Sequence, residues 1–276
     1  MKYEKIKFIY IYFLLTVIIF AQEGYIASFN TLRLGKSQKD YTLTAQALEM
    51  FDIVGLVEVM DIEGAEKLVN ALEKVSGEKW DYHISPFPVG KNSYKEYFAY
   101  VWKKDKVKFL KERGFYKDVE DKFARPPYGA DFKIGKFDFT FVLVHSVFGK
   151  NESARRAEAF KMNEVYDYFQ NMDLQENDII IAGDFNLSGF DESFEKLLSH
   201  SDKIIYALSP VIKTTLGKKS LANSYDNMFL STIYTKEFTG KSGALDFTQG
   251  QYKLMKDKIS DHLPIFIVVE ISEDDD

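Results

Sequence analysis

Short apolar runs alternate along the chain with segments in which apolar residues recur at helical spacing. The runs at 178–182 and 265–270 are almost wholly apolar, as in strands that are buried on both faces. Further strands are predicted at 25–34, 52–59, 97–102, 137–146 and 227–230. Helices are predicted at 42–51, 62–76, 154–172 and 193–198, and Gly77 ends the second of them. This interleaving predicts one α/β domain with a mixed sheet or a pair of sheets.

The first residues follow a different pattern. Lys2, Lys5 and Lys7 precede an apolar stretch of fourteen residues at 8–21. A membrane-spanning helix needs about 20 apolar residues, so this stretch is short for one. The pattern predicts a signal peptide at 1–21, a single domain at 22–276 and a secreted or periplasmic protein. An uncleaved N-terminal anchor is the alternative.

Composition excludes several kinds of chemistry. The 276 residues include no cysteine, which rules out disulfides, thiolate metal sites and a cysteine nucleophile. An exported protein without disulfides suggests a bacterial source. The net charge of −6 gives no general attraction for nucleic acid, so a polyanion would need local cations and metal ions. Nothing predicts a coiled coil, and we expect a monomer without a stable membrane partner.

Polar side chains stand where several predicted strands begin or end. Asp184 and Asn186 follow the run at 179–183, and side chains two apart on a strand point to the same side. A single polar residue at a strand end usually caps a turn. The pattern is harder to attribute to chance because the positions carry only amides, carboxylates and imidazoles: Asn30, Glu58, His145, Asp184, Asn186, Asp226, Asp261 and His262.

Phosphodiester hydrolysis is the chemistry that needs such a set. A divalent cation neutralises the phosphate, and Glu58 is a natural oxygen ligand for it. Asn30, Asp184, Asn186 or Asp261 could complete the shell. Water must lose a proton and the leaving oxygen must gain one, and imidazole does both near neutral pH. His145 and His262 allow one histidine for each role, with Glu96 and Asp226 as candidates to support them.

Simpler interpretations exist for each residue taken alone. A lone histidine is more often structural, and His83 and His200 lie outside the pattern, in a predicted loop and at a helix end. Glu58 could be an ion-pair partner, and the Asp261–His262 pair could cap a strand. The segment 91–96 could be an ordinary solvated loop.

Taken together, these residues resemble the endonuclease/exonuclease/phosphatase superfamily, and within it the deoxyribonuclease I branch. Gly-Asp-Phe-Asn at 183–186 and Ser-Asp-His-x-Pro at 260–264 are quite specific to the superfamily, and Asn-Ser-Tyr-Lys-Glu at 92–96 points to the deoxyribonuclease branch. The other matching pieces follow the family's order over nearly the whole mature chain: 28–30, 56–59, 123–125, 144–145 and 224–226. The resemblance implies an α/β/β/α sandwich, with two packed mixed sheets between helices and the site at one edge.

The resemblance also implies roles for these residues and a dependence on Mg²⁺, Mn²⁺ or Ca²⁺. It implies that His262, oriented by Asp226, activates water, and that His145, supported by Glu96, protonates the leaving oxygen. The sequence does not decide which histidine is the acid and which is the base.

The resemblance implies that Glu58 and Asn30 bind metal, and that Asp184 and Asn186 hold metal, water or phosphate. It implies that Tyr94 and Arg125 contact the nucleic-acid backbone or minor groove. Asp261 stays a further candidate metal ligand from the residue pattern alone.

One position departs from the deoxyribonuclease pattern. Met60 stands two residues after Glu58, where that branch typically offers an arginine to the minor groove. The sequence therefore predicts a weaker grip on DNA, or one that depends more on Tyr94 and neighbouring lysines.

Three functions are consistent with this pattern. The first is a secreted, metal-dependent endonuclease that cuts DNA with little sequence preference; RNA remains open as a substrate. The second is hydrolysis of another phosphoester, such as a phospholipid in the manner of a sphingomyelinase, which would need an exposed apolar loop like 86–88. The third is a non-catalytic binding module, which should have lost a site residue, and none is missing.

Overall fold

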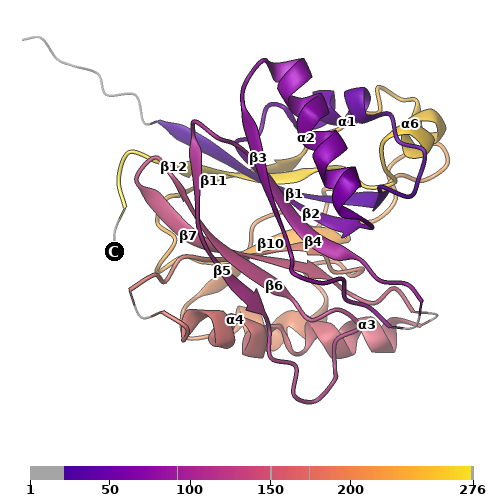
Figure 1. Cartoon of the computed structure of the whole chain (residues 1–276). Coiled ribbons are helices and arrows are strands. Elements are labelled where there is room, and N and C mark those ends of the chain that lie inside the picture. The colour runs from indigo at the N-terminus through magenta and orange to yellow at the C-terminus, as the bar shows by residue number, and fades with distance from the viewer. Residues whose placement is uncertain (1–21, 92, 150, 174, 275–276) are drawn as a thin grey trace, which may run out of the picture.

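The computed structural model describes residues 22–91, 93–149, 151–173 and 175–274. They form two six-stranded sheets packed face to face, with helices on both outer surfaces (Figure 1). The predicted four-layer α/β/β/α arrangement is thereby confirmed. The predicted signal peptide at 1–21 lies outside the described residues. Within the described ranges, no helix combines the length and apolar character needed to cross a membrane.

Each sheet contains one pair of parallel strands near its centre. The first sheet has the order β11 (Phe238–Ala244), β12 (Ile265–Glu270), β1 (Glu23–Leu34), β2 (Ile53–Val59), β4 (Tyr97–Lys103) and β3 (Trp80–Ile84). The second has the order β5 (Val107–Phe115), β6 (Tyr128–Ile134), β7 (Phe137–His145), β8 (Ile179–Asp184), β10 (Asp226–Ser231) and β9 (Ile204–Tyr206). β1 runs parallel to β2 and β7 runs parallel to β8, whereas the other pairings are antiparallel.

The central strands are apolar on both faces because each face is covered. On β7, Phe139 and Phe141 point into the core between the sheets, while Val142 and Val144 point toward the outer helices. Gly55 on β2 faces the partner sheet, and a Cβ atom there would lie 2.3 Å from the side chain of Leu143. The sheets therefore approach closely, near the strand ends that form the site.

Helices cover the two outer faces. α1 (Tyr41–Leu48) and α2 (Ile62–Ser76) pack on the first sheet. α3 (Glu152–Ala159), α4 (Met162–Gln170), the 3₁₀ turn η1 (Glu192–Phe194) and α5 (Glu195–Leu198) cover the second. The short α6 (Tyr252–Lys258) leads into β12. The predicted helix at 62–76 is confirmed as α2, capped by Asp61 and ended by Gly77 with φ of 73°.

Other predictions of elements were wrong. The helix predicted at 154–172 is two helices, because hydrogen bonds of i→i−3 type at Lys161 and Glu164 tighten the chain between α3 and α4. The strands β3, β5, β6, β9 and β11 and the helix α6 were not predicted. His83 lies in β3 rather than in a loop, where its ring stacks on Phe109 at 4.6 Å and its Nε2 contacts the Tyr128 hydroxyl at 2.7 Å.

Candidate active site

The predicted polar residues meet at one edge of the sandwich. β1, β2, β7 and β8 all end there, and the segments that precede β4, β10 and β12 reach the same edge. They surround a cleft of about 360 Å³. Its lining consists of Leu32, Glu58, His145, Phe148, Asp184, Asn186, Thr215, Leu216, Ala222, Asn223, Tyr225, Lys256, Asp261 and His262.

The first imidazole–carboxylate pair joins His145 to Glu96. His145 ends β7, and its Nδ1 lies 2.6 Å from Oε1 of the fully buried Glu96. Burial lowers the pKa of His145, but the charges of Glu96 and Asp184 outweigh it and raise the pKa above its ordinary value. The remaining nitrogen, Nε2, lies 3.9 Å from Glu58 Oε1 and 3.8 Å from Asp184 Oδ2. Nε2 is therefore the nitrogen that faces the acidic groups of the cleft.

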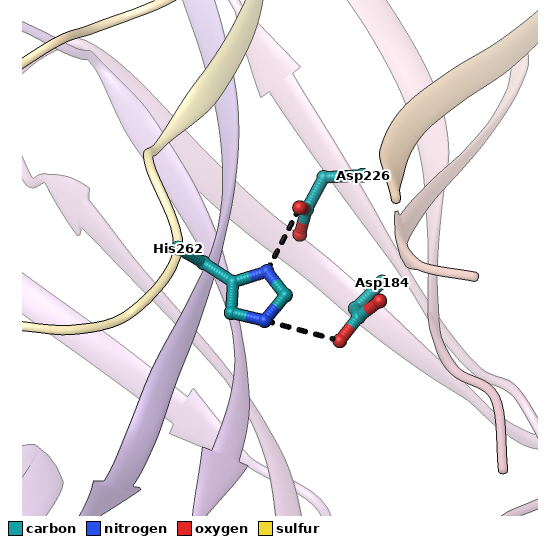
Figure 2. Close-up of side chains that lie close together, drawn as sticks. All are labelled: Asp184, Asp226 and His262. Carbon is teal, nitrogen blue, oxygen red and sulfur yellow. Dashed lines mark hydrogen bonds and ion pairs between the residues drawn. The ribbon is translucent and has the colours of Figure 1, made fainter. Parts of the chain in front are cut away.

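The second pair joins His262 to Asp226 (Figure 2). His262 Nδ1 lies 2.8 Å from Asp226 Oδ2, and the Thr214 hydroxyl donates to the same oxygen over 2.6 Å. Burial lowers the pKa of His262, but Asp226 and Asp184 overcome this and raise it to about 10. Nε2 of His262 lies 3.6 Å from Asp184 Oδ2. Both imidazoles thus present Nε2 to the same carboxylate oxygen.

Each pair takes one member from each sheet. His145 ends a strand of the second sheet, and Glu96 directly precedes β4 of the first. His262 precedes β12 of the first sheet, and Asp226 opens β10 of the second. The site therefore lies on the seam between the two sheets.

Oxygen atoms suited to a hard cation gather beside the first pair. Asn30 Nδ2 donates to Glu58 Oε1 over 3.2 Å and to Asp184 Oδ2 over 3.0 Å, which brings carboxylates of both sheets to one amide. Carboxylate and amide oxygens are the ligands that Mg²⁺ and Ca²⁺ prefer. Asp261 also lines the cleft, but its Oδ2 pairs with Lys256 Nζ at 2.9 Å.

Another compact acidic group fits a cation less well. Asp184, Asp226 and His262 offer ligand atoms that lie within 4.8 Å of one another. However, Asp226 and His262 are already bonded to each other. Among these three, only Asp184 shares a hydrogen-bond partner, Asn30, with Glu58. The residues therefore fit a cation that is held between Glu58 and Asp184.

Strained backbone positions aim two of these side chains. Glu58 has φ of 59° and Asn186 has φ of 53°, in the left-handed region that non-glycine residues adopt only at a cost. Hydrogen bonds hold both: the Glu58 N–H donates to Glu96, and the Asn186 N–H donates to Asp184 Oδ1 over 2.9 Å. Asp184 and Asn186 reach one cleft as predicted. The turn at Asn186 brings the two side chains together, and not the alternation of side chains along a strand, since β8 ends at Asp184.

Tyr94 and Arg125 form a wall of the site. The Tyr94 hydroxyl donates to Glu58 Oε2 over 2.9 Å. Arg125 pairs with Glu96 at 3.0 Å, and its guanidinium lies 5.4 Å from the centre of the Tyr94 ring. Arg33, which the sequence analysis did not select, lies 5.5 Å from the same ring. Met60 is only 9% exposed, whereas Arg33 is exposed and lies on the irregular end of β1.

Two buried charged residues that the sequence analysis missed hold the loops around the cleft. Arg155 Nη1 donates to the backbone oxygen of Asn186 over 3.2 Å. The carboxylate of Glu158 accepts from the N–H groups of Ala124 at 2.7 Å and Val147 at 2.9 Å, and burial raises its pKa. Both lie on the buried face of α3, beside Ala159. The apolar spacing gave no signal for them, because Ala154 and Ala157 of the same helix are exposed.

No known family profile matches the chain. Among individual proteins, the two described next are similar to this chain over most of its length. A deoxyribonuclease from Thioalkalivibrio sp. (strain K90mix) is 28% identical over 258 residues, which cover 89% of this chain and 70% of the relative. Human deoxyribonuclease-1-like 1 is 26% identical over 268 residues, which cover 92% of this chain and 86% of the relative.

Solved structures share the fold. An endonuclease/exonuclease/phosphatase family protein from Bacteroides thetaiotaomicron superposes with a TM-score of 0.64 at 19% identity, covering 90% of this chain and 97% of its own. D. rerio TDP2 complexed with single-strand DNA product gives 0.61 at 15% identity, covering 89% and 98%.

Fold, site and relatives together support the endonuclease/exonuclease/phosphatase superfamily for this chain. Within that superfamily, the similarity to proteins named deoxyribonuclease supports the deoxyribonuclease I-like branch, which the sequence motifs predicted. The names of these relatives support a nuclease or phosphodiesterase activity.

Proposed function

We propose that the protein is a secreted, divalent-cation-dependent endonuclease that hydrolyses DNA phosphodiester bonds with little sequence preference. One observation carries the proposal: the two imidazole–carboxylate pairs face one carboxylate, Asp184, at 3.8 Å and 3.6 Å. Two imidazoles around one point can serve the attacking water and the leaving oxygen of a single phosphodiester. The deoxyribonuclease names of its relatives support DNA, and the pattern at 1–21 supports export.

The two imidazoles divide the proton transfers. His262 Nε2 accepts the proton of the attacking water, while Asp226 fixes its tautomer and stabilises the imidazolium that forms. His145 Nε2 donates a proton to the leaving oxygen, and Glu96 keeps that imidazole charged. The raised pKa of His145 suits a donor. The raised pKa of His262 means that positive charge must approach Asp184 before this imidazole accepts a proton.

Glu58 and Asp184 would hold the cation, and Asn30 would join them by turning its amide oxygen toward it in place of the Nδ2 that now donates to both carboxylates. Mg²⁺ is expected, with Mn²⁺ or Ca²⁺ as alternatives. A divalent cation there supplies charge neutralisation of the phosphate and offsets the carboxylates that raise the pKa of both imidazoles. Asp261 is a second candidate ligand once Lys256 releases it.

Asn186, Tyr94 and Arg125 would bind the substrate. Asn186 is held by its bond to the Ser146 carbonyl, and it lines the cleft beside Asp184. The Tyr94 ring and the Arg125 guanidinium present an aromatic and a cationic surface next to Glu58. Such groups bind the backbone and the minor groove of DNA without reading sequence.

Plasmid nicking with a series of metals tests the proposal. We expect nicked and then linear plasmid with Mg²⁺ or Mn²⁺, and none with EDTA. His145→Ala and His262→Ala should each lose most activity while their circular dichroism spectra stay unchanged. Full activity in folded His262→Ala would refute the assigned site.

Parallel assays on RNA and sphingomyelin test the alternative substrates. The lipid alternative gains no support from the loop at 86–88. Phe87 is 55% exposed, but its ring stacks on Phe115 at 4.8 Å rather than extending as a free apolar loop. Hydrolysis of sphingomyelin without nicking of plasmid would replace the proposed function.

A further inference from the structure

A second groove lies beside the active-site cleft. It has a volume of about 580 Å³ and lies between α6 and the hairpin that spans 214–223. Its lining consists of Leu216, Gly217, Lys218, Lys253, Lys256 and Asp257. Leu216 and Lys256 also line the active-site cleft, so the two hollows are adjacent. We name this second hollow the lysine groove.

The lysine groove is basic in an otherwise acidic protein. Its lining carries three lysines and one aspartate, and the exposed Lys219 directly follows Lys218, whereas the whole chain has a net charge of −6. Lys218 and Lys219 are exposed and form no ion pair with any part of the chain that the structure describes. Lys253 is 86% exposed, and its contact with Asp257 is an exposed i,i+4 pair of little energetic weight. These charges are therefore available to an anion.

Both walls are tied directly to His262. The hairpin pairs with it through the Thr215–His262 bridge, and the Leu216 N–H donates to the Asp261 carbonyl over 2.7 Å. On the other wall, α6 is followed by Ser260. The His262 N–H donates to the Ser260 hydroxyl over 3.1 Å, which fixes the His262 backbone. In Figure 1, α6 lies at the end of the molecule toward which β1 and β2 point. The lysines are thus held at a fixed position relative to the candidate catalytic histidine.

We propose that the lysine groove binds phosphates of a nucleic-acid strand beyond the scissile bond. This inference rests on the proposed function and specifies its substrate class as polymeric nucleic acid rather than a small phosphoester. A single phosphodiester fits the active-site cleft and does not reach Lys218, Lys219 or Lys253. A strand that continues out of the cleft meets them, and lysine contacts to phosphates supply affinity without sequence information.

A triple variant, Lys218→Ala with Lys219→Ala and Lys253→Ala, tests the inference on two substrates. On plasmid DNA at about 0.1 M salt we expect kcat/KM to fall about 10- to 100-fold, and the slope of log kcat/KM against log salt concentration to shrink by about 2 to 3. On bis(p-nitrophenyl) phosphate, which is too small to reach the groove, activity should stay within about twofold.

The matched control removes three exposed lysines elsewhere. Lys74→Ala, Lys108→Ala and Lys136→Ala cause the same change in net charge at positions far from the cleft: the last turn of α2, the start of β5 and the β6–β7 turn. It should leave plasmid cleavage nearly unchanged. Equal losses in the two triple variants, or none in the groove variant, would overturn the inference.

Binding without catalysis separates this inference from the proposed function. Fluorescence anisotropy of a labelled 20-base-pair duplex is measured with His262→Ala protein, with and without the three groove substitutions. Weaker, less salt-dependent binding in the combined variant supports the lysine groove even if the wild type does not cleave DNA. Identical binding curves would contradict it even if plasmid is nicked.

Discussion

Replacing Asp226 by asparagine removes one negative charge from the second imidazole pair and leaves the shape of the side chain almost unchanged. Asp226 is 3% exposed, and a single oxygen accepts from His262 over 2.8 Å and from Thr214 over 2.6 Å. If the amide oxygen of the new asparagine takes the place of this oxygen, it accepts both hydrogen bonds but carries no charge. If the amide NH2 group takes that place, it faces the Nδ1–H donor of His262 with another donor. In the first orientation His262 keeps an acceptor for Nδ1–H but loses the charge that stabilises its imidazolium, and in the second it also loses the partner that fixes its tautomer.

The size of the effect follows from the charges around His262. Asp226 and Asp184 now raise the pKa of His262 to about 10 against the opposing effect of burial. In Asp226→Asn, burial opposes only the Asp184 charge, and the pKa of His262 falls. Each pKa unit lost corresponds to about 1.4 kcal/mol. Loss of the orienting carboxylate should lower kcat on plasmid about 100- to 10,000-fold, with a smaller effect on KM.

The pH dependence of stability gives an independent readout. The pKa of His262 is raised in the folded protein, so the pair stabilises the fold fully below about pH 6.5, and this contribution is lost as the pH rises toward about 10. The free energy of unfolding of the wild type, measured by urea denaturation, should therefore decrease over this range. Asp226→Asn should show a smaller decrease.

Asp131→Asn is the matched control. Asp131 is also 3% exposed, and one of its oxygens likewise accepts from a threonine hydroxyl, Thr140 at 2.8 Å, and from a cation, Arg113 at 2.7 Å. It should lose a similar amount of stability but keep its kcat at temperatures where it is folded. If Asp226→Asn kept kcat within threefold of wild type, the assignment of Asp226 as the orienting group would be wrong.

Three further substitutions probe the cation, the substrate and the backbone. Glu58→Gln should abolish the rise in Tm that Mn²⁺ causes in the absence of DNA and lower kcat at least about 100-fold; an unchanged rise would remove Glu58 from the ligand set. Arg33→Ala should raise KM for plasmid about 3- to 10-fold and leave kcat within about twofold, whereas an unaltered KM would show that the cation over Tyr94 does not touch DNA. Gly183→Ala would place a Cβ atom 1.8 Å from the Val144 carbonyl at a φ of 149°. It should cost more than about 4 kcal/mol in guanidinium unfolding, and a loss under about 1 kcal/mol would contradict the observed approach of β7 and β8.

Local signals in the sequence predicted much of the fold. Helix α2 was predicted with its observed bounds because its apolar stripe and Gly77 are all within one segment. The apolar runs of β8 and β12 were clear because both faces of these strands are buried. The edge strands were missed for the opposite reason. β5 and β11 expose much of their length, so their sequences carry weak alternation, and their extended form depends on the neighbouring strand.

The residues selected from the sequence lie together in the structure, but their pairings came from the family resemblance and not from any local signal. The motifs selected both histidines, and the resemblance matched each with its carboxylate. Nothing local in the sequence links His145 to Glu96, which lies 49 residues earlier on the other sheet. Arg33 was missed because its relation to Tyr94 exists only after the irregular end of β1 has formed. The sequence analysis considered Met60 instead, which turns out to be buried.

Because each imidazole is matched to a carboxylate of the opposite sheet, the chemistry depends on how the two layers are aligned. The main-chain hydrogen bonds that pair neighbouring strands act within a layer and do not set this alignment. It is set by interlocking aromatic rings such as Tyr100 against Phe141, whose centroids are 5.5 Å apart. If one sheet shifted by about an ångström relative to the other, the His145–Glu96 and His262–Asp226 contacts would lengthen together. Activity would then be lost while every strand remained intact. Conservative changes deep in this aromatic interior, remote from any substrate, are therefore a means of tuning turnover.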